Sequence, residues 1–243
     1  MKEYTDVATF GCSFAYAIGC SHSNIHEDGP FVDKKTKKIT CYNNHWPKID
    51  ECFGSIVSAG LGTNRHIEAR MGGSNHYIIR KVFEWCRHNK NKWNSSLLLI
   101  GISESQRYEY HDEFGWHQEK PLDTDGLGYF KHEMPDEVQW LSVVQGIIGL
   151  QSFLKLNNID HVFFDSMTPL KKQKPKNDTL GGTELFDNFV LYDDWYIHPK
   201  YESFWYTIKE NPSLGAPCTH PNVDGHKFWG ESLLEYIHKM IKV

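Results

Sequence analysis

Two residues at opposite ends of the chain are candidates for a nucleophile and its base. Ser13 lies in the segment 10–14 (FGCSF), in a Gly-x-Ser turn directly after an apolar run. His220 lies in the segment 219–226 (THPNVDGH), where the proline that follows restricts the backbone of the histidine. A serine hydroxyl is a weak nucleophile and needs a base within hydrogen-bond reach, which an imidazole supplies. Taken singly, the two residues are also explained as a turn serine and a structural histidine, so neither defines a function by itself.

Two further segments carry groups that such a reaction needs. The segment 69–75 (ARMGGSN) places paired glycines before a predicted helix, where free N–H groups favour negative charge. These N–H groups could hold an oxyanion. The alternative is a glycine-rich loop that leads into a helix cap and has no catalytic role. The segment 101–107 (GISESQR) gathers polar side chains that can reach the same site. An ion pair of Glu104 and Arg107 that stiffens this loop is the alternative.

The elements that must position these residues follow from the apolar pattern. Short continuous apolar runs at 7–10, 97–100 and 162–164 predict strands covered on both faces. Ser74 or Asn75 can cap one helix, Asp136 can start another and a terminal helix follows Asp224, each with apolar residues at helical spacing. This alternation predicts a single α/β domain over residues 1–243, folded as a three-layer α/β/α sandwich with a mostly parallel sheet.

Three long stretches resist assignment, namely 19–48, 103–135 and 167–215. Each follows a predicted strand or a catalytic-looking segment, and ligands of open α/β sheets bind outside the carboxyl ends of the strands. We therefore expect these insertions to rim the site. The third contains aromatic residues that are either stacking platforms for sugar rings or a packed insertion or subunit interface: Tyr192, Trp195, Tyr196, Tyr201, Phe204, Trp205 and Tyr206.

The composition narrows the function classes. The 243 residues are 40% hydrophobic and 23% charged, with a formal net charge of −5, which is globular and lacks the basic excess of a nucleic-acid binder. No apolar run reaches the roughly 18 residues of a membrane helix, and no signal peptide is visible, so a cytoplasmic location without membrane contact is expected. Six cysteines without a CxxC pair predict free thiols. Pairs such as His111 with Asp112, or His22 with His26, complete no ligand set, so neither a metal nor another cofactor is expected.

In this order, the segments resemble the SGNH hydrolase superfamily, also called GDSL-like esterases. The segment 11–14 (GCSF) matches the first block, with Cys12 in place of the usual aspartate, and 72–75 (GGSN) looks like the second, whose glycine N–H lines the oxyanion hole. The segment 220–226 is similar to the last block, where the histidine before Pro-Asn is the general base. The resemblance spans nearly the whole chain and implies the flavodoxin-like SGNH fold. The spelling looks most like members found in tailed phages and other viruses.

Two positions depart from the family pattern. The asparagine that completes the family's oxyanion hole is replaced by Ser103, so Asn75 or the Ser103 hydroxyl would substitute beside the N–H groups of Ser13 and Gly73. The aspartate three residues before the histidine is replaced by Pro217. The resemblance therefore implies a Ser13–His220 dyad, oriented by a backbone carbonyl or by a carboxylate from elsewhere such as Asp165, with Arg107 as a substrate contact.

Two hypotheses follow. The first is a carboxylic-ester hydrolase that acts on small or carbohydrate O-acyl esters, acetyl esters in particular. The second is a non-catalytic SGNH-like module, structural or glycan-binding, which self-associates or serves as a virion component. The two missing family residues favour the second hypothesis, and a fold by itself does not define a function.

Overall fold

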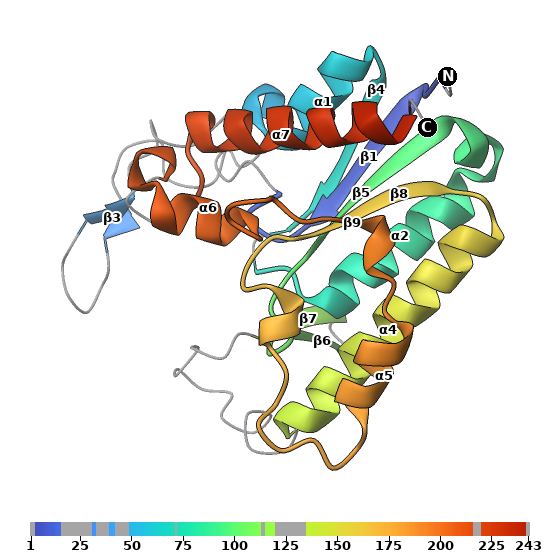
Figure 1. The fold of residues 1–243 in the computed structure, drawn as a ribbon, viewed down its shortest axis with the longest axis vertical. Coiled ribbons are helices and arrows are strands. Elements are labelled where there is room, and N and C mark those ends of the chain that lie inside the picture. The colour runs from blue at the N-terminus through green and yellow to red at the C-terminus, as the bar shows by residue number, and fades with distance from the viewer. Residues whose placement is uncertain are drawn as a thin grey trace.

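A five-stranded, all-parallel sheet forms the middle of the molecule (Figure 1). The computed structural model describes residues 3–15, 31–32, 39–41, 49–70, 72–112, 115–119, 135–215 and 220–241. The strand order is β4-β1-β5-β8-β9, which is 2-1-3-4-5 along the chain, the flavodoxin-like order. The strands are β1 (Asp6–Gly11), β4 (Asn64–Ala69), β5 (Ser96–Ile102), β8 (Asp160–Asp165) and β9 (Trp195–Tyr196). The predicted fold class is confirmed.

Helices cover both faces of this sheet and create two cores. Successive side chains of β5 alternate between them: Leu97 and Leu99 point to one core, and Leu98 and Ile100 to the other. The first core is closed by α1 (Phe53–Leu61), α6 (Phe204–Glu210) and α7 (Val223–Ile241), and the second by α2 (Asn75–His88), α4 (Asp136–Leu156) and α5 (Gly182–Phe189).

The three predicted helices form where their caps and apolar spacing place them. The Ser74 hydroxyl accepts the Tyr77 N–H at 3.1 Å and caps α2, whose Ile78 and Val82 are fully buried. The long helix α4 begins at Asp136. In α7, Asn222 Oδ1 accepts the Gly225 N–H at 2.8 Å, so the helix begins one residue before Asp224. The three predicted helices are confirmed, and α7 begins at Val223 rather than after Asp224.

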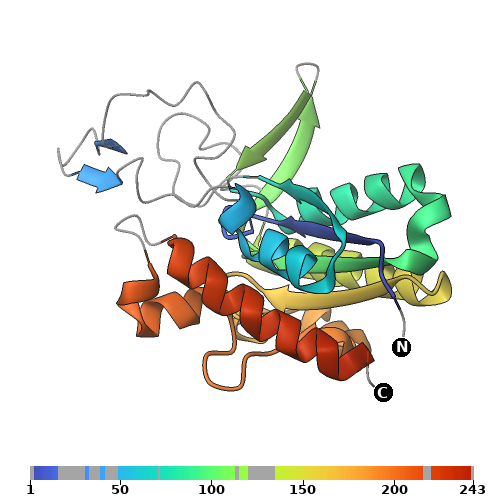
Figure 2. The same ribbon diagram turned by 90° about the horizontal axis from the view of Figure 1, so that it is seen from above.

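The stretches that resisted assignment contain short elements. The range 167–215 is not a structureless loop, because it folds into α5, β9, α6 and several 3-10 turns. The range 103–135 includes a hairpin that stands out from the layers (Figure 2), β6 (Tyr108–Asp112) with β7 (Gly115–Glu119). Within 19–48 lie β2 (Phe31–Val32) and β3 (Ile39–Cys41). The 3-10 turns are η2 (Ile49–Glu51), η3 (Lys90–Ser95), η4 (Leu170–Lys172), η5 (Tyr192–Asp194) and η6 (Pro212–Leu214).

The side chains of three of the six cysteines are among the described residues. Cys12, Cys52 and Cys86 are buried free thiols, in agreement with the prediction for them. Cys20 and Cys218 lie outside the described residues, as does the side chain of Cys41. Within the described part of the chain, no helix combines the length and the apolar character that crossing a bilayer requires.

Candidate active site

The structure brings Ser13 and His220 into contact across 207 positions of sequence. Ser13 lies in the turn that leaves the carboxyl end of β1, closed by the Ala15 N–H donating to Cys12 O at 3.0 Å. Its Oγ lies 3.1 Å from His220 Nε2. Ser13 is 5% exposed and the imidazole is half-buried, so the contact lies just beneath the surface. This is the arrangement in which an imidazole can accept a proton from a serine hydroxyl.

An aromatic wall holds the imidazole on one side. The Phe14 ring lies 5.4 Å from the His220 ring, centroid to centroid, and is itself 3% exposed. Phe14 makes edge contacts with Phe204 at 5.7 Å and with Trp205 at 5.9 Å, both from the start of α6. The residue next to the serine therefore ties the site to the α6 side of the core.

Gly73 lies directly against the turn that carries Ser13. A Cβ at this position would stand 3.2 Å from Cys12 Cα and 3.2 Å from Gly11 O, so only glycine allows this approach without a shift. The Gly73 N–H donates to Arg70 O at 2.9 Å. The hydrogen of the expected oxyanion donor is thus used inside its own turn, and Gly73 contributes close packing.

Asn75 and Ser103 are in contact, but among the described residues only the Asn75 side chain has hydrogen-bond partners. The Asn75 side chain bridges to the Ser103 backbone: its Oδ1 accepts the Ser103 N–H at 2.7 Å, and its Nδ2 donates to Ser103 O at 3.1 Å. This clasp joins the start of α2 to the end of β5. The Ser103 hydroxyl is fully buried and has no hydrogen-bond partner among the described residues.

The two remaining candidates have partners of their own. Asp165 ends β8 and its Oδ1 accepts the Leu170 N–H at 3.0 Å; among the described residues, no hydrogen bond or ion pair joins it to His220. Burial raises the pKa of this carboxyl to about 7. Arg107 Nε lies 3.3 Å from Glu104 Oε2, which is the ion pair weighed above as the alternative for this loop.

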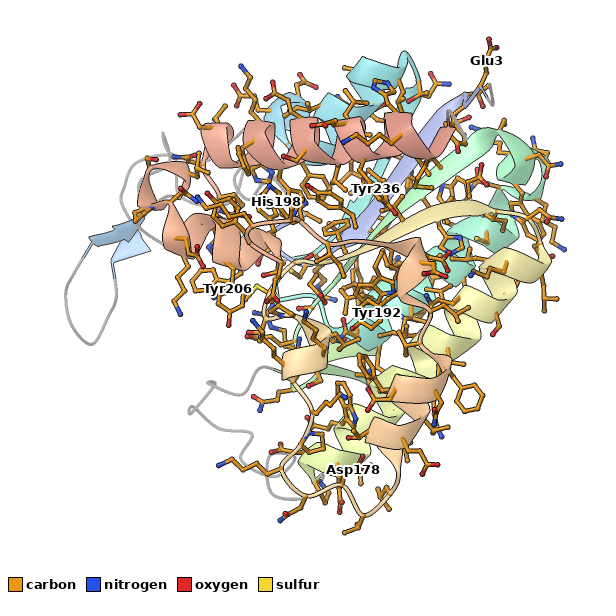
Figure 3. The ribbon with its side chains drawn as sticks, in the orientation of Figure 1. Glu3, Asp178, Tyr192, His198, Tyr206 and Tyr236 are labelled. Carbon is orange, nitrogen blue, oxygen red and sulfur yellow. The ribbon has the colours of Figure 1, made fainter. Side chains whose placement is uncertain are left out.

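The aromatic stretch 192–206 serves mainly as core. Its rings pack on both sides of the sheet: Tyr192 lies toward α4 and α5, and His198, within the same stretch of sequence, lies toward α7 (Figure 3). A stacking platform needs an open ring face, and most of these rings have none. The packed alternative therefore holds for the four buried residues: Trp195, Tyr196, Tyr201 and Phe204. Tyr192, Trp205 and Tyr206 are half-buried.

Sequence reasoning passed over one polar residue at this edge. Ser166 follows β8, and its fully buried hydroxyl has no hydrogen-bond partner among the described residues. It lies over Gly101, where a Cβ would come within 2.4 Å of Ser166 Oγ. The signal was present, because a serine directly after a buried parallel strand meets the rule used for Ser13 and Ser103.

A groove lies at the carboxyl edge of the sheet, and its lining includes neither Ser13 nor His220. It measures about 430 Å³ and lies between the loop after β5, the start of α4 and the segment after β8, with polar residues Ser105, Gln106, Asp136, Lys176 and Asn177 among its lining. Within the described part of the chain, no group of three or more histidine, cysteine, aspartate or glutamate side chains could hold a metal ion. His111 and Asp112 are described only as backbone, and His22 and His26 lie outside the described residues.

The fold is similar to that of known esterases. No family model matches the chain, and no curated protein matches it in sequence. A carbohydrate esterase with "divergent catalytic and non-catalytic binding functions" superimposes with a TM-score of 0.52 at 12% identity, over 98% of this chain and 69% of that one. A carbohydrate esterase family 2 enzyme with a carbohydrate-binding domain, from Corynascus thermopiles (Myceliophthora fergusii), superimposes with a TM-score of 0.50 at 12% identity. The match covers 100% of this chain and 68% of that one. A G-D-S-L family lipolytic protein from Veillonella parvula gives 0.47 at 13% identity, over 95% and 97%.

Proposed function

We propose that the protein is a serine esterase that hydrolyses small or carbohydrate O-acyl esters through Ser13 and His220. The observation that carries the proposal is the 3.1 Å approach of Ser13 Oγ to His220 Nε2. The pair lies where the first strand of a 2-1-3-4-5 sheet ends, beside β5, and the strand order reverses at this point. A crevice at such a switch point is where open α/β sheets bind their ligands.

The reaction proceeds in two halves. Ser13 Oγ attacks the carbonyl carbon of the ester while its proton passes to His220 Nε2, and a tetrahedral oxyanion forms. The carbon–oxygen bond to the alcohol then breaks, and His220 returns the proton to the departing alkoxide. Water then attacks the acyl-serine and gives a proton to His220. The bond between the acyl carbon and Ser13 Oγ breaks, and His220 returns the proton to Ser13 Oγ as the acid leaves.

The oxyanion needs donors that are not already used. Among the described residues, the Ser13 N–H has no hydrogen-bond partner, and the Ser103 hydroxyl is buried and unpartnered. We assign the oxyanion hole to these two groups, because the Gly73 N–H serves Arg70 O and the Asn75 amide serves the Ser103 backbone. Buried donors without other partners are the ones worth most to a developing charge.

An acetylated carbohydrate is the substrate class we favour. The groove at the same edge is lined by hydroxyl, amide and charged side chains, which suit a ligand with many hydroxyl groups. The two structures with the higher TM-scores are described as carbohydrate esterases, which supports the same choice. Neither a metal nor another cofactor enters the proposed reaction.

Hydrolysis of p-nitrophenyl acetate and of acetylated xylooligosaccharides tests the proposal directly. Wild type should release acetate, Ser13→Ala should not, and a serine-directed phosphonate should label Ser13 in a peptide map. Ser95→Ala, at the opposite end of the sheet, is the control and should behave as wild type. Equal inertness of wild type and Ser13→Ala to both substrates, together with no phosphonate label, would favour the non-catalytic structural or glycan-binding alternative, a virion component included.

A further inference from the structure

A second histidine of the segment 220–226 is buried behind the proposed dyad. His226 lies in the first turns of α7 and is 1% exposed. Its ring stacks on Phe53 of α1, with centroids 6.1 Å apart and planes 13° apart, and meets the edge of Phe204 at 5.6 Å. The imidazole therefore lies between α7, α1 and α6 and has no access to a substrate.

His226 caps helix α1 from outside. The N-cap residue of α1, Cys52, makes no side-chain capping bond, so the first N–H groups of the helix need another acceptor. His226 Nδ1 accepts the Phe53 N–H at 3.3 Å. An accepting Nδ1 carries no proton, so the ring is the neutral Nε2–H tautomer. Burial lowers the pKa of His226 to about 3, with a smaller contribution from His220, and thus keeps Nδ1 available as an acceptor.

The backbone between the two histidines is tightly held. The His226 N–H donates to Asn222 O at 3.0 Å, and Asn222 Nδ2 donates to Ser213 O at 2.7 Å. Gly225 packs under Leu214 O, where a Cβ would come within 2.2 Å. With these bonds, the seven residues from His220 to His226 form a compact unit attached to η6. A displacement of His226 would therefore be transmitted to His220.

The same unit is also linked through aromatic rings. Phe204 contacts the His226 ring and, at 5.7 Å, the Phe14 ring. Phe14 in turn contacts His220 and neighbours Ser13 in the chain. The base and the nucleophile are thus both connected to His226, one through the backbone of α7 and the other through the aromatic cluster.

We propose that His226 is a positioning residue for the Ser13–His220 dyad. By accepting the Phe53 N–H, it docks the first turn of α7 on α1 and so holds His220 Nε2 at bonding distance from Ser13 Oγ. The inference rests on the proposed esterase function and assigns His226 no contact with substrate.

Two substitutions of His226 separate the effect of losing the hydrogen-bond acceptor from the effect of losing side-chain volume. Asn places Oδ1 where His has Nδ1 and keeps the acceptor but loses volume, whereas Leu keeps the volume but loses the acceptor. We expect His226→Leu to lower kcat about 10- to 100-fold with KM nearly unchanged, as for a misplaced catalytic group. His226→Asn should stay within about threefold of the wild-type kcat even where its melting temperature is the lower of the two.

His161 offers a matched control. It is another buried histidine, on β8, whose Nδ1 bonds to Ile159 O at 2.8 Å, and it has no part in the site. His161→Leu should destabilise the protein but leave the kcat of the folded enzyme unchanged. Equal loss of kcat in His226→Leu and His226→Asn, or no loss in His226→Leu, would overturn the inference.

A measurement on the wild-type protein covers the case in which His226→Leu does not fold. Long-range ¹H–¹⁵N spectra report the tautomer of each histidine, and His226 should remain Nε2–H from about pH 5 to pH 9. A proton on Nδ1, or an inactive but folded His226→Asn, would refute the positioning role. An inactive wild type would instead refute the proposed function, so the two failures can be told apart.

Discussion

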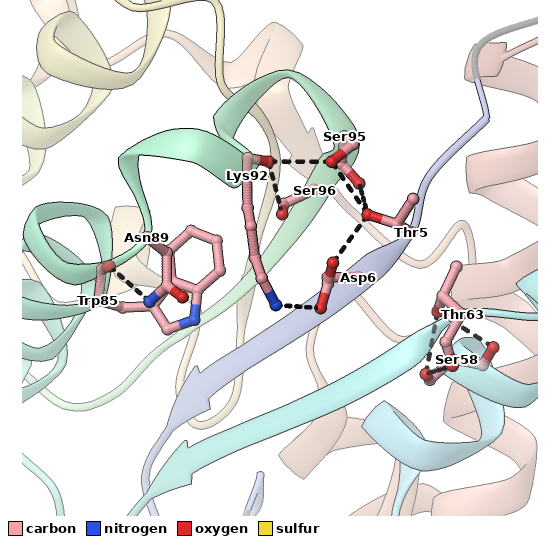
Figure 4. Close-up of polar contacts among 9 residues, drawn as sticks. All are labelled: Thr5, Asp6, Ser58, Thr63, Trp85, Asn89, Lys92, Ser95 and Ser96. Atoms are coloured by element: carbon pink, nitrogen blue, oxygen red, sulfur yellow. Dashed lines mark hydrogen bonds and ion pairs between the residues drawn. The ribbon is translucent and has the colours of Figure 1, made fainter.

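The two ends of the central sheet carry similar polar residues and use them differently. At the amino end, the polar groups around the starts of β1 and β5 are bonded to one another (Figure 4). Lys92 Nζ lies 2.9 Å from Asp6 Oδ1, the Thr5 hydroxyl donates to Asp6 Oδ2 at 2.7 Å, and the Ser96 hydroxyl donates to Lys92 O at 2.8 Å. This network joins the starts of β1 and β5 to η3, and its polar atoms are satisfied within the protein.

At the carboxyl end, polar atoms are buried without such partners. The hydroxyls of Ser103 and Ser166 have no hydrogen bond among the described residues, and Asp165 is a buried carboxyl with a raised pKa. A buried group without a partner costs folding free energy, so natural structures hold few of them. The comparison teaches that residue type does not separate a stabilising edge from a candidate site. The state of the hydrogen bonds does.

The largest expected effect breaks the dyad. Ser13→Ala and His220→Ala should each reduce ester hydrolysis on the order of 10⁴-fold or more, because the two residues act as one unit. For the same reason the double variant should be no slower than either single one. Steady-state kinetics on all three variants measures this, and losses that multiply in the double variant would show that the two residues act independently.

Substitutions of Asn75 and Ser103, which form the clasp at the carboxyl end, should separate effects on the catalytic rate from effects on stability. Ser103→Ala removes an unpartnered hydroxyl, so kcat should fall about 100- to 1,000-fold if it is the oxyanion donor, with no loss of melting temperature. Asn75→Ala leaves the buried Ser103 N–H and C=O unsatisfied and should lower the free energy of unfolding by about 2–4 kcal/mol. Urea unfolding beside kinetics gives both numbers. A Ser103→Ala enzyme with full activity would remove this hydroxyl from the oxyanion hole.

Asp165 should make stability depend on pH. Its pKa of about 7 in the folded state lies above the value of 3.8 for a free aspartate. The folded state therefore binds the proton more tightly, and this contribution to stability is complete below pH 4 and is lost as the pH rises toward 7. Lys171 and Glu202 are the nearby charges, and they act in opposite directions.

Asp165→Asn isolates this contribution, because an amide oxygen can still accept the Leu170 N–H. The variant should match wild type near pH 4 and exceed it increasingly up to pH 7, by roughly 1 kcal/mol for each pH unit. Thermal unfolding of both proteins across this range measures the difference. A constant difference would mean that Asp165 ionises normally.

The smallest expected effect belongs to the amino end. Ser96→Ala removes one hydrogen bond to Lys92 O and should cost about 1 kcal/mol of unfolding free energy, with kcat unchanged. Ser103→Ala, at the other end of β5, should show the opposite pattern, with a lower kcat and an unchanged melting temperature. A fall in kcat for Ser96→Ala would end the distinction between the edges.

The sequence predicted the elements whose pattern is strong. Continuous apolar runs marked β1, β5 and β8, since central parallel strands are buried on both faces. The strands β4 and β9 were missed. β4 (NRHIEA) is an edge strand with three of its six residues exposed and the other three half-buried, and β9 has two residues. The helix α1, rich in glycine and serine, has weak intrinsic propensity and forms because α7 and β1 pack against it.

For the site, residue types and their places after strands or before helices made Ser13, His220 and the glycines before α2 candidates, and the resemblance to the SGNH hydrolases added Asn75 and Ser103. The sequence could not say which of them keep free hydrogen-bonding groups. Only the tertiary structure brought Ser13 to His220, gave the Gly73 N–H to Arg70 and the Asn75 amide to Ser103, and left the Ser103 hydroxyl unpartnered. Hydrogen-bond partners depend on distances of a few tenths of an ångström between segments far apart in the chain, and local sequence does not encode these distances.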